Sequence, residues 1–249
     1  MKGSITIVGL GPGSDDLVSP EVNKAILSAT DIVGYKKYTK RITKRHNLNI
    51  HSSDNKYEIY RAKFALDLAS TGKKVVIVSS GDPGIFAMSS AFFEYLEKTT
   101  RKIDNIEIKV LPGISSMLAA SSRIGAPLGH DFCVINLSDN LKSWELLKKR
   151  IILTIQGDFV VVLFNPRSKN RPFTLKKTFD LFKNHSECDR YVFFAKSVYK
   201  KNEDLKVVKL SKASHEMADM NTLVIIGSSL SKVIKKNKIY LYTPRSHTL

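Results

Sequence analysis

The sequence predicts an α/β fold built from two α/β domains, and three features of the chain support this prediction. In the first half, short apolar runs alternate with amphipathic stretches, an order typical of strand and helix units around a parallel sheet. Glycine and proline punctuate residues 125–129, and a new apolar run follows at once. The 249 residues are enough for one large core or two modest ones. We therefore expect domains at residues 1–126 and 127–249.

The pattern of the first half predicts a regular series of elements. Strands are expected at residues 5–10, 31–34, 75–79 and 106–111, and helices at residues 57–71, 87–98 and 115–124. A further helix should begin at Pro20, because Ser19 can cap it and Glu21 places a carboxylate in its first turn. The helix over residues 57–71 is expected to end at Gly72. Its buried face is predicted to hold Ile59, Ala62, Leu66 and Ala69.

The second half predicts more strand than helix. Strands are expected at residues 132–137, 159–164, 191–195, 205–210, 222–226 and 238–242. A helix capped by Ser143 should bury Trp144, Leu147, Ile151 and Ile155, and a second helix should cover residues 173–182. The last two strands have no long helix between them. We therefore expect the tail to form the antiparallel part of a mixed sheet.

Composition limits the classes of protein to consider. Forty basic residues against twenty-three acidic ones give a formal charge of +17. This charge can attract a polyanion such as nucleic acid or a polycarboxylate, and the alternative is that it only keeps the surface solvated. The two cysteines, Cys133 and Cys188, offer neither a disulfide framework nor the spacing of a metal site. The first apolar run leaves no room for a signal peptide, and no run is long enough to span a membrane. We expect a cytoplasmic protein.

A glycine loop, Gly9-Leu10-Gly11-Pro12-Gly13-Ser14, follows the first predicted strand. Its position invites comparison with the dinucleotide-binding fingerprint. The details differ, because Ser14 replaces the third glycine and Pro12 removes a backbone donor that a pyrophosphate would need. A nicotinamide or flavin dinucleotide is therefore disfavoured, and a structural tight turn remains an alternative.

Two more loops follow later strands of the first half. Residues 79–86, with the sequence SSGDPGIF, fix an irregular exposed backbone that can present carbonyl oxygens to a sulfonium cation. Residues 112–116, with the sequence PGISS, offer hydroxyls and helix amides suited to a carboxylate or ribose. Each loop alone could be a turn or a helix cap. Three glycine loops at the ends of successive strands together predict a ligand site, because open α/β sheets bind ligands there.

In this order and spacing, the three loops resemble the cofactor motifs of the tetrapyrrole methylase family. The resemblance continues through residues 164–166 and 223–227 and so covers nearly the whole chain. It implies a class III S-adenosylmethionine-dependent methyltransferase, with the cofactor in a cleft between two α/β domains and a homodimer as the usual assembly. S-adenosylhomocysteine would be the product.

Other segments are similar to one branch of this family, which methylates carbon 17 of precorrin-3B, or its cobalt form, with ring contraction during cobalamin biosynthesis. These segments are residues 34–36, 125–132, 137–139, 165–168 and 242–245. They discriminate better than the glycine loops, because methylases of other ring positions generally keep the loops and vary these segments. The implied substrate is a polycarboxylated tetrapyrrole, and the sequence leaves its metal content open.

The resemblance implies three groups of site residues. The cofactor would be lined by Pro12, Gly81, Asp82, Pro83, Ile85, Phe86, Ser115, Ser116, Phe164, Asn165 and Gly227. The carboxylates of the macrocycle would be met by Tyr35, Lys36, Arg167 and Arg245, with a surface role as the alternative for each. Proton movement would be assisted by His130, Asp131, Ser138 and Asp139. For His130 and Asp131, a local hydrogen-bonded cap is the favoured interpretation.

Two other functions are alternatives to methylation of a corrinoid precursor. A relative of the same fold could methylate another ring position or the 2'-hydroxyl of ribosomal RNA, which the positive charge would suit. A basic nucleic-acid-binding protein without activity is less compatible, because the chain lacks a basic helix with interleaved aromatic residues. Nucleic acid is therefore not the expected partner.

Overall fold

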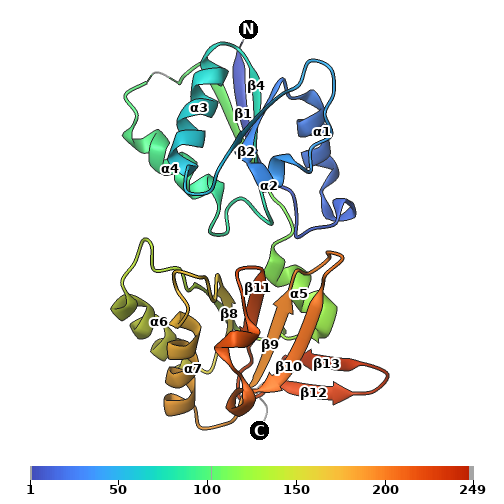
Figure 1. Ribbon diagram of the computed structural model, residues 1–249, viewed down its shortest axis with the longest axis vertical. Helices are drawn as coiled ribbons and strands as arrows, with labels where there is room; N and C mark the ends of the chain where they lie inside the picture. The colour runs from blue at the N-terminus through green and yellow to red at the C-terminus, as the bar shows by residue number, and fades with distance from the viewer. Residues whose placement is uncertain (1, 102, 247–249) are drawn as a thin grey trace. The chain divides into compact units, whose positions relative to one another are not determined.

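The computed structural model describes residues 2–101 and 103–246, which divide into two compact units (Figure 1). The first unit spans Met1–Ser116 and the second spans Met117–Leu249. The division falls ten residues before the boundary expected at residue 126, so helix α5, Ser116–Ile124, lies almost wholly in the second unit. Its buried residues Ala119, Ala120 and Ile124 pack against strands of that unit, which explains the assignment.

The first unit contains a five-stranded sheet in the order β3-β2-β4-β1-β5. Every neighbouring pair in it is parallel, as the alternation of strands and helices predicted. The strands are β1 Gly3–Gly9, β2 Asp31–Tyr35, β3 Asn49–Ser53, β4 Lys74–Ser79 and β5 Ile106–Leu111. Because the sheet is wholly parallel, the carboxyl ends of all five strands lie at one edge.

Helices cover both faces of this sheet (Figure 1). Helices α3, Glu58–Ser70, and α4, Met88–Lys98, bury one face, and α1, Pro20–Ser28, buries the other. Ser19 caps α1 as predicted, since its hydroxyl accepts the Val22 N–H at 3.2 Å. Gly72 follows α3 with a φ of +84°, which fits the predicted helix end.

Three features of the first unit differ from the prediction. Strand β3 and the one-turn helix α2, Lys36–Thr39, were not predicted, because one is polar and the other is short. Ile59 is exposed, so its predicted place on the buried face of α3 is wrong. Arg61 is buried there instead, and its guanidinium donates to the Ser53 hydroxyl and the Asp54 carbonyl. A buried cation with these acceptors is tolerated where an unpaired one would not be.

The second unit contains a mixed five-stranded sheet in the order β10-β9-β11-β8-β7. Its strands are β7 Phe132–Asn136, β8 Val160–Phe164, β9 Tyr191–Lys196, β10 Asp204–Lys209 and β11 Thr222–Ile226. Strand β11 lies antiparallel between β8 and β9, and β10 is antiparallel to β9, which confirms the predicted mixed sheet. Strands β7 and β8 are parallel.

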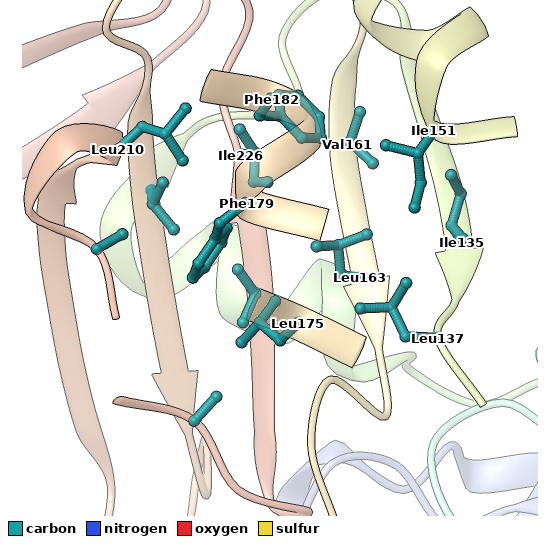
Figure 2. Packing of buried hydrophobic residues seen from close by; sticks show 14 of the residues in the cluster. Ile135, Leu137, Ile151, Val161, Leu163, Leu175, Phe179, Phe182, Leu210 and Ile226 are labelled. Atoms are coloured by element: carbon teal, nitrogen blue, oxygen red, sulfur yellow. The ribbon is translucent and has the colours of Figure 1, made fainter. Parts of the chain in front are cut away.

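One face of this sheet is buried by helices α6, Trp144–Gln156, and α7, Thr174–His185 (Figure 2). Figure 2 shows Phe179 and Phe182 of α7 packed among aliphatic side chains of the strands. Ser143 caps α6 as predicted, with its hydroxyl 3.3 Å from the Leu146 nitrogen. Helix α5 covers the opposite face.

The final strand, β13 Ile239–Tyr242, is not part of the mixed sheet, contrary to the prediction. It forms a three-stranded sheet with β12, Lys232–Lys235, and the two-residue strand β6, Gly125–Ala126. The predicted linker therefore supplies a strand for the tail of the chain. Among the described helices, none has the length and apolar character needed to cross a bilayer.

Candidate functional site

The first unit gathers its predicted site residues at one edge of the sheet. The loops after β1, β4 and β5 all leave from the carboxyl ends of parallel strands, and so do Tyr35 at the end of β2 and Lys36 beyond it. Strands β1 and β4 are neighbours in the sheet. The chain runs from β1 to β2, on one side of this pair, and from β4 to β5, on the other side. Open α/β sheets bind ligands at such a point.

The backbones of the three glycine loops lie against one another, and two of the loops are hydrogen-bonded. The Gly11 N–H donates to the Gly81 carbonyl at 3.2 Å, and the Gly81 N–H donates back to Gly11 at 2.9 Å. A Cβ on Gly9 would lie 2.3 Å from the Gly81 oxygen, and one on Gly113 would lie 2.1 Å from it. Only glycine permits this close approach at either position, which gives the glycine pattern a structural reason.

Asp82 connects two of these loops. One carboxylate oxygen accepts the Gly84 N–H at 2.8 Å, and the other accepts the Gly113 N–H at 3.0 Å. The side chain thus holds the loop after β4 against the loop after β5. This arrangement makes Asp82 a residue that shapes the site.

The loop after β4 also has unusual backbone geometry. Gly81 has a φ of +59°, and Phe86 has a φ of +52° although it is not glycine. Phe86 is 48% exposed, whereas Pro12, Pro83 and Ser115 are buried. An exposed aromatic ring beside backbone polar groups suits a ligand with both apolar and polar parts. Ile85 and Ser116 are partly exposed in the same group of loops.

Two neighbouring contacts were not predicted from the sequence. The Tyr38 hydroxyl forms a hydrogen bond with Ser80 in the loop after β4, and burial raises the pKa of this tyrosine. Lys36 forms an exposed ion pair with Asp54 at 2.5 Å. Lys36 therefore has a partner within the chain and must exchange it to meet a ligand carboxylate.

The predicted site residues of the second unit fall at two opposite edges of its sheet. Because β11 runs antiparallel to β8, its end at Gly227 lies beside the start of β8, not beside Asn165. Strand β8 has five residues, which span roughly 16 Å at about 3.3 Å per residue. We call the end of β8 the Asn165 edge and the end of β11 the Gly227 edge.

The Asn165 edge holds a connected network. Asn165 has a φ of +51°, and its side-chain amide donates to the side-chain oxygen Oδ1 of Asn136 at 3.0 Å. The same oxygen accepts the Ser138 N–H at 2.9 Å. Phe164 and Asn165, expected near a cofactor, thus lie beside Ser138 and Asp139, expected to assist proton movement. A left-handed backbone at a non-glycine residue carries strain, which is common at functional sites.

Two arginines lie at the Asn165 edge and differ in how many hydrogen-bond partners they have. Arg167 has a buried Nε without a hydrogen-bond partner among the described residues, and its Nη1 lies 3.5 Å from the Ala218 oxygen. Arg171 was not singled out in the sequence. Its Nε lies 3.4 Å from an Asp139 oxygen, and its Nη1 donates to the Leu137 and Asn165 carbonyls at 3.1 and 3.2 Å. The recurrence of arginine within residues 167–171 was the available signal.

Gly227 at the opposite edge has structural contacts. Its N–H donates to the Tyr191 carbonyl at 2.8 Å, and its own carbonyl accepts from Arg190 at 3.3 Å. The expected cofactor set required Gly227 and Asn165 to lie together, but the structure places them at opposite edges of the sheet. The reversal of β11 explains the difference.

His130 and Asp131 also lie at the Gly227 edge, where the Asp131 carbonyl accepts the Val160 N–H. The His130 Nδ1 accepts the Asp131 N–H at 2.8 Å, and the two side chains are 3.8 Å apart. This is the local cap favoured above. Arg245 is exposed and lies two residues after Thr243. Thr243 runs close to Gly129, because a Cβ on that glycine would lie 2.5 Å from the Thr243 carbonyl oxygen. His130, Asp131 and Arg245 are thus not assembled with Ser138 and Asp139.

Comparisons with known proteins agree on one family. The profile of the Tetrapyrrole (Corrin/Porphyrin) Methylases matches residues 4–214. The chain is 40% identical over 247 residues to a precorrin-3B C(17)-methyltransferase of Sinorhizobium sp, and the match covers 98% of this chain and 97% of that protein. It is 36% identical over 231 residues to a cobalt-factor III methyltransferase of Priestia megaterium, covering 92% of this chain and 43% of that longer protein.

Solved structures show the same relation. The crystal structure of the methyltransferase CobJ matches with a TM-score of 0.93 and 48% identity, over 97% of this chain and all of that one. The cobalt precorrin-4 methyltransferase CbiF matches with a TM-score of 0.69 over 90% of this chain and 94% of that one. Its identity is 17%, so this second likeness concerns the fold alone.

Proposed function

The chain belongs to the tetrapyrrole (corrin/porphyrin) methylases, and from this membership we propose that it methylates carbon 17 of precorrin-3B or its cobalt form during cobalamin biosynthesis. The observation that carries the proposal is the 40% identity to the Sinorhizobium enzyme, which extends over almost the full length of both chains. The CobJ likeness supports the same reaction class. Ring contraction accompanies the methyl transfer in this proposal.

The methyl donor in this proposal is S-adenosylmethionine. When bound, it supplies an electrophilic methyl group on a sulfonium and leaves as S-adenosylhomocysteine. The residues present fit such a ligand, because the joined glycine loops place backbone polar groups beside the exposed Phe86 ring. Asp82 would act by holding these loops together. In the second unit, Phe164 and Asn165 are the candidate cofactor residues, and Gly227 is not.

The substrate in this proposal is the polycarboxylated macrocycle. Arg167 is the strongest candidate for one of its carboxylates, because its guanidinium has few partners within the described chain. Tyr35 and Lys36 are candidates in the first unit, where they share an edge with the glycine loops. Arg245 is a weaker candidate, since it lies with the Gly227 edge of its unit.

Side chains at the Asn165 edge would handle protons. Ser138 and Asp139 follow β7 beside Asn165, and an Asp139 carboxylate oxygen lies 3.4 Å from the Arg171 Nε. A carboxylate near the ring could accept the proton released as the macrocycle rearranges. The remaining catalysis would come from alignment of the two reactants and exclusion of water, since methyl displacement disperses charge.

Binding measurements test the proposal. Calorimetry should detect one S-adenosylhomocysteine per chain. A stable tetrapyrrole should bind at the macrocycle site, and RNA should not displace it. Absence of binding would refute the proposed donor. Displacement of the tetrapyrrole by RNA at physiological salt would instead favour the ribosomal RNA alternative, which the charge of +17 allows. We further propose a homodimer located in the cytoplasm.

A further inference from the structure

The guanidinium of Arg171 is nearly enclosed by the Asn165 edge, and every nitrogen of it faces a partner. Its side chain is 10% exposed. Nη1 donates to the carbonyls of Leu137 and Asn165, Nε faces Asp139, and Nη2 lies 3.9 Å from the Met220 sulfur. Four of its five N–H donors thus face a partner within the chain, so the guanidinium has little left to offer a ligand.

The acceptors of Arg171 belong to two separate loops. Leu137 and Asp139 follow β7, whereas Asn165 follows β8. Two hydrogen bonds already connect these segments: the Leu137 N–H donates to the Phe164 carbonyl at 2.9 Å, and the Asn165 amide donates to the Asn136 side chain at 3.0 Å. Arg171 adds a further connection. The planar fork of a guanidinium can reach two carbonyls and a carboxylate together, which a lysine ammonium cannot do with the same geometry.

The base of the Arg171 side chain is also fixed. Ser168 and Arg171 exchange backbone hydrogen bonds at 3.1 and 3.2 Å, and the Arg171 N–H is shared with the Ser168 hydroxyl at 3.1 Å. A rigid turn therefore presents the guanidinium to the strand ends. The carbonyl it holds on Asn165 belongs to a residue with a φ of +51°, which needs surrounding contacts to persist.

We propose that Arg171 is a positioning residue, which locks the loops after β7 and β8 so that Asn165 and Asp139 are held in their functional geometry. This inference rests on the proposed function in one respect, the identity of the ligand that Asn165 meets. It assigns to Arg171 no contact with the cofactor or the macrocycle. Arg171 and Arg167, four positions apart, thus have separate roles.

The test compares Arg171→Lys and Arg171→Ala with Arg190→Lys. Arg190 is a matched control, because it is also buried and donates to backbone carbonyls, but at the Gly227 edge of the same sheet. Two quantities are measured for each folded variant: amide hydrogen exchange in residues 136–140 and 164–168, and affinity for S-adenosylhomocysteine.

Both Arg171 variants should exchange faster in the two loops, and Arg171→Ala should bind S-adenosylhomocysteine about tenfold more weakly or worse, because charge-assisted hydrogen bonds are lost. Arg171→Lys should fall between wild type and Arg171→Ala. Arg190→Lys should lower the melting temperature while leaving loop exchange and affinity unchanged. Unchanged exchange in the Arg171 variants, or an equal loss of affinity in Arg190→Lys, would overturn the inference. A wild type that binds no S-adenosylhomocysteine would refute the proposed function, and loop exchange would still decide the role of Arg171.

Discussion

Gly81 shows how the candidate cofactor site depends on backbone conformation. Its φ is +59°, while a Cβ built on it would meet no atom nearer than the Ser115 Cα at 3.7 Å. A side chain at this position therefore fits sterically but strains the backbone. Gly9 and Gly113 differ, because a Cβ there would collide with the Gly81 carbonyl.

The substitution Gly81→Val should weaken binding of S-adenosylhomocysteine strongly, since a β-branched residue disfavours positive φ by roughly 1–3 kcal/mol and the loop would shift. Calorimetry on the folded variant measures this effect. Gly72→Val is the control, because Gly72 also has a positive φ but lies before β4, at the far end of the strand. Equal loss of affinity in both variants would mean that the effect is general destabilisation.

Arg167 provides a second prediction for a single residue. Arg167→Gln should weaken binding of a stable tetrapyrrole about tenfold and leave S-adenosylhomocysteine binding nearly unchanged, because the macrocycle carries many carboxylates and one charge-assisted contact is lost. Separate titrations of the two ligands measure the difference, and added salt should imitate part of it. Arg245→Gln should have the smaller effect. Equal losses for both ligands in Arg167→Gln would show that this arginine supports the fold instead.

Helix caps and strand order show which elements could be predicted from the sequence. Ser19 and Ser143 each precede an apolar periodic run, so local chemistry was enough to place α1 and α6. Strand β3 lacks such a signal, because it is polar and forms the edge of its sheet. Arg61 occupies a buried helix position because Ser53 and Asp54, at the end of β3 and just beyond it, accept its hydrogen bonds, which periodicity cannot reveal.

The candidate site could also be predicted only in part from the sequence. The loops of the first unit follow parallel strands, so their common edge could be inferred from sequence order alone. In the second unit the reversed strand β11 takes Gly227 to the edge opposite Asn165, and strand direction cannot be read from a short apolar run. Arg171 was missed because its role depends on contacts with two loops.

Helix α6 gives a prediction for an element. Ser143→Ala should lower the free energy of unfolding by about 1 kcal/mol, because the Leu146 N–H loses its capping acceptor. Denaturant titration should show a lower midpoint with an unchanged slope. A change below the error of that measurement would mean that water satisfies the exposed N–H equally well.

Two properties belong to the molecule as a whole, its charge and its assembly. The charge of +17 suits capture of a polycarboxylate, and this use of it is consistent with the family of the chain. A homodimer is expected, since closed two-fold assembly is the commonest arrangement of soluble oligomers. Light scattering at micromolar concentration should report twice the chain mass of 27.9 kDa, and a monomer at that concentration would contradict the expectation.

The most direct test of the central claim is methyl transfer itself. Purified protein would be incubated with S-adenosylmethionine carrying a ¹³C-methyl group and, in separate reactions, with precorrin-3B and its cobalt form. The account predicts one labelled methyl group per macrocycle, located at carbon 17 by nuclear magnetic resonance, with at least one of the two substrates. A label at another ring carbon, or labelling of ribosomal RNA without labelling of either macrocycle, would contradict it.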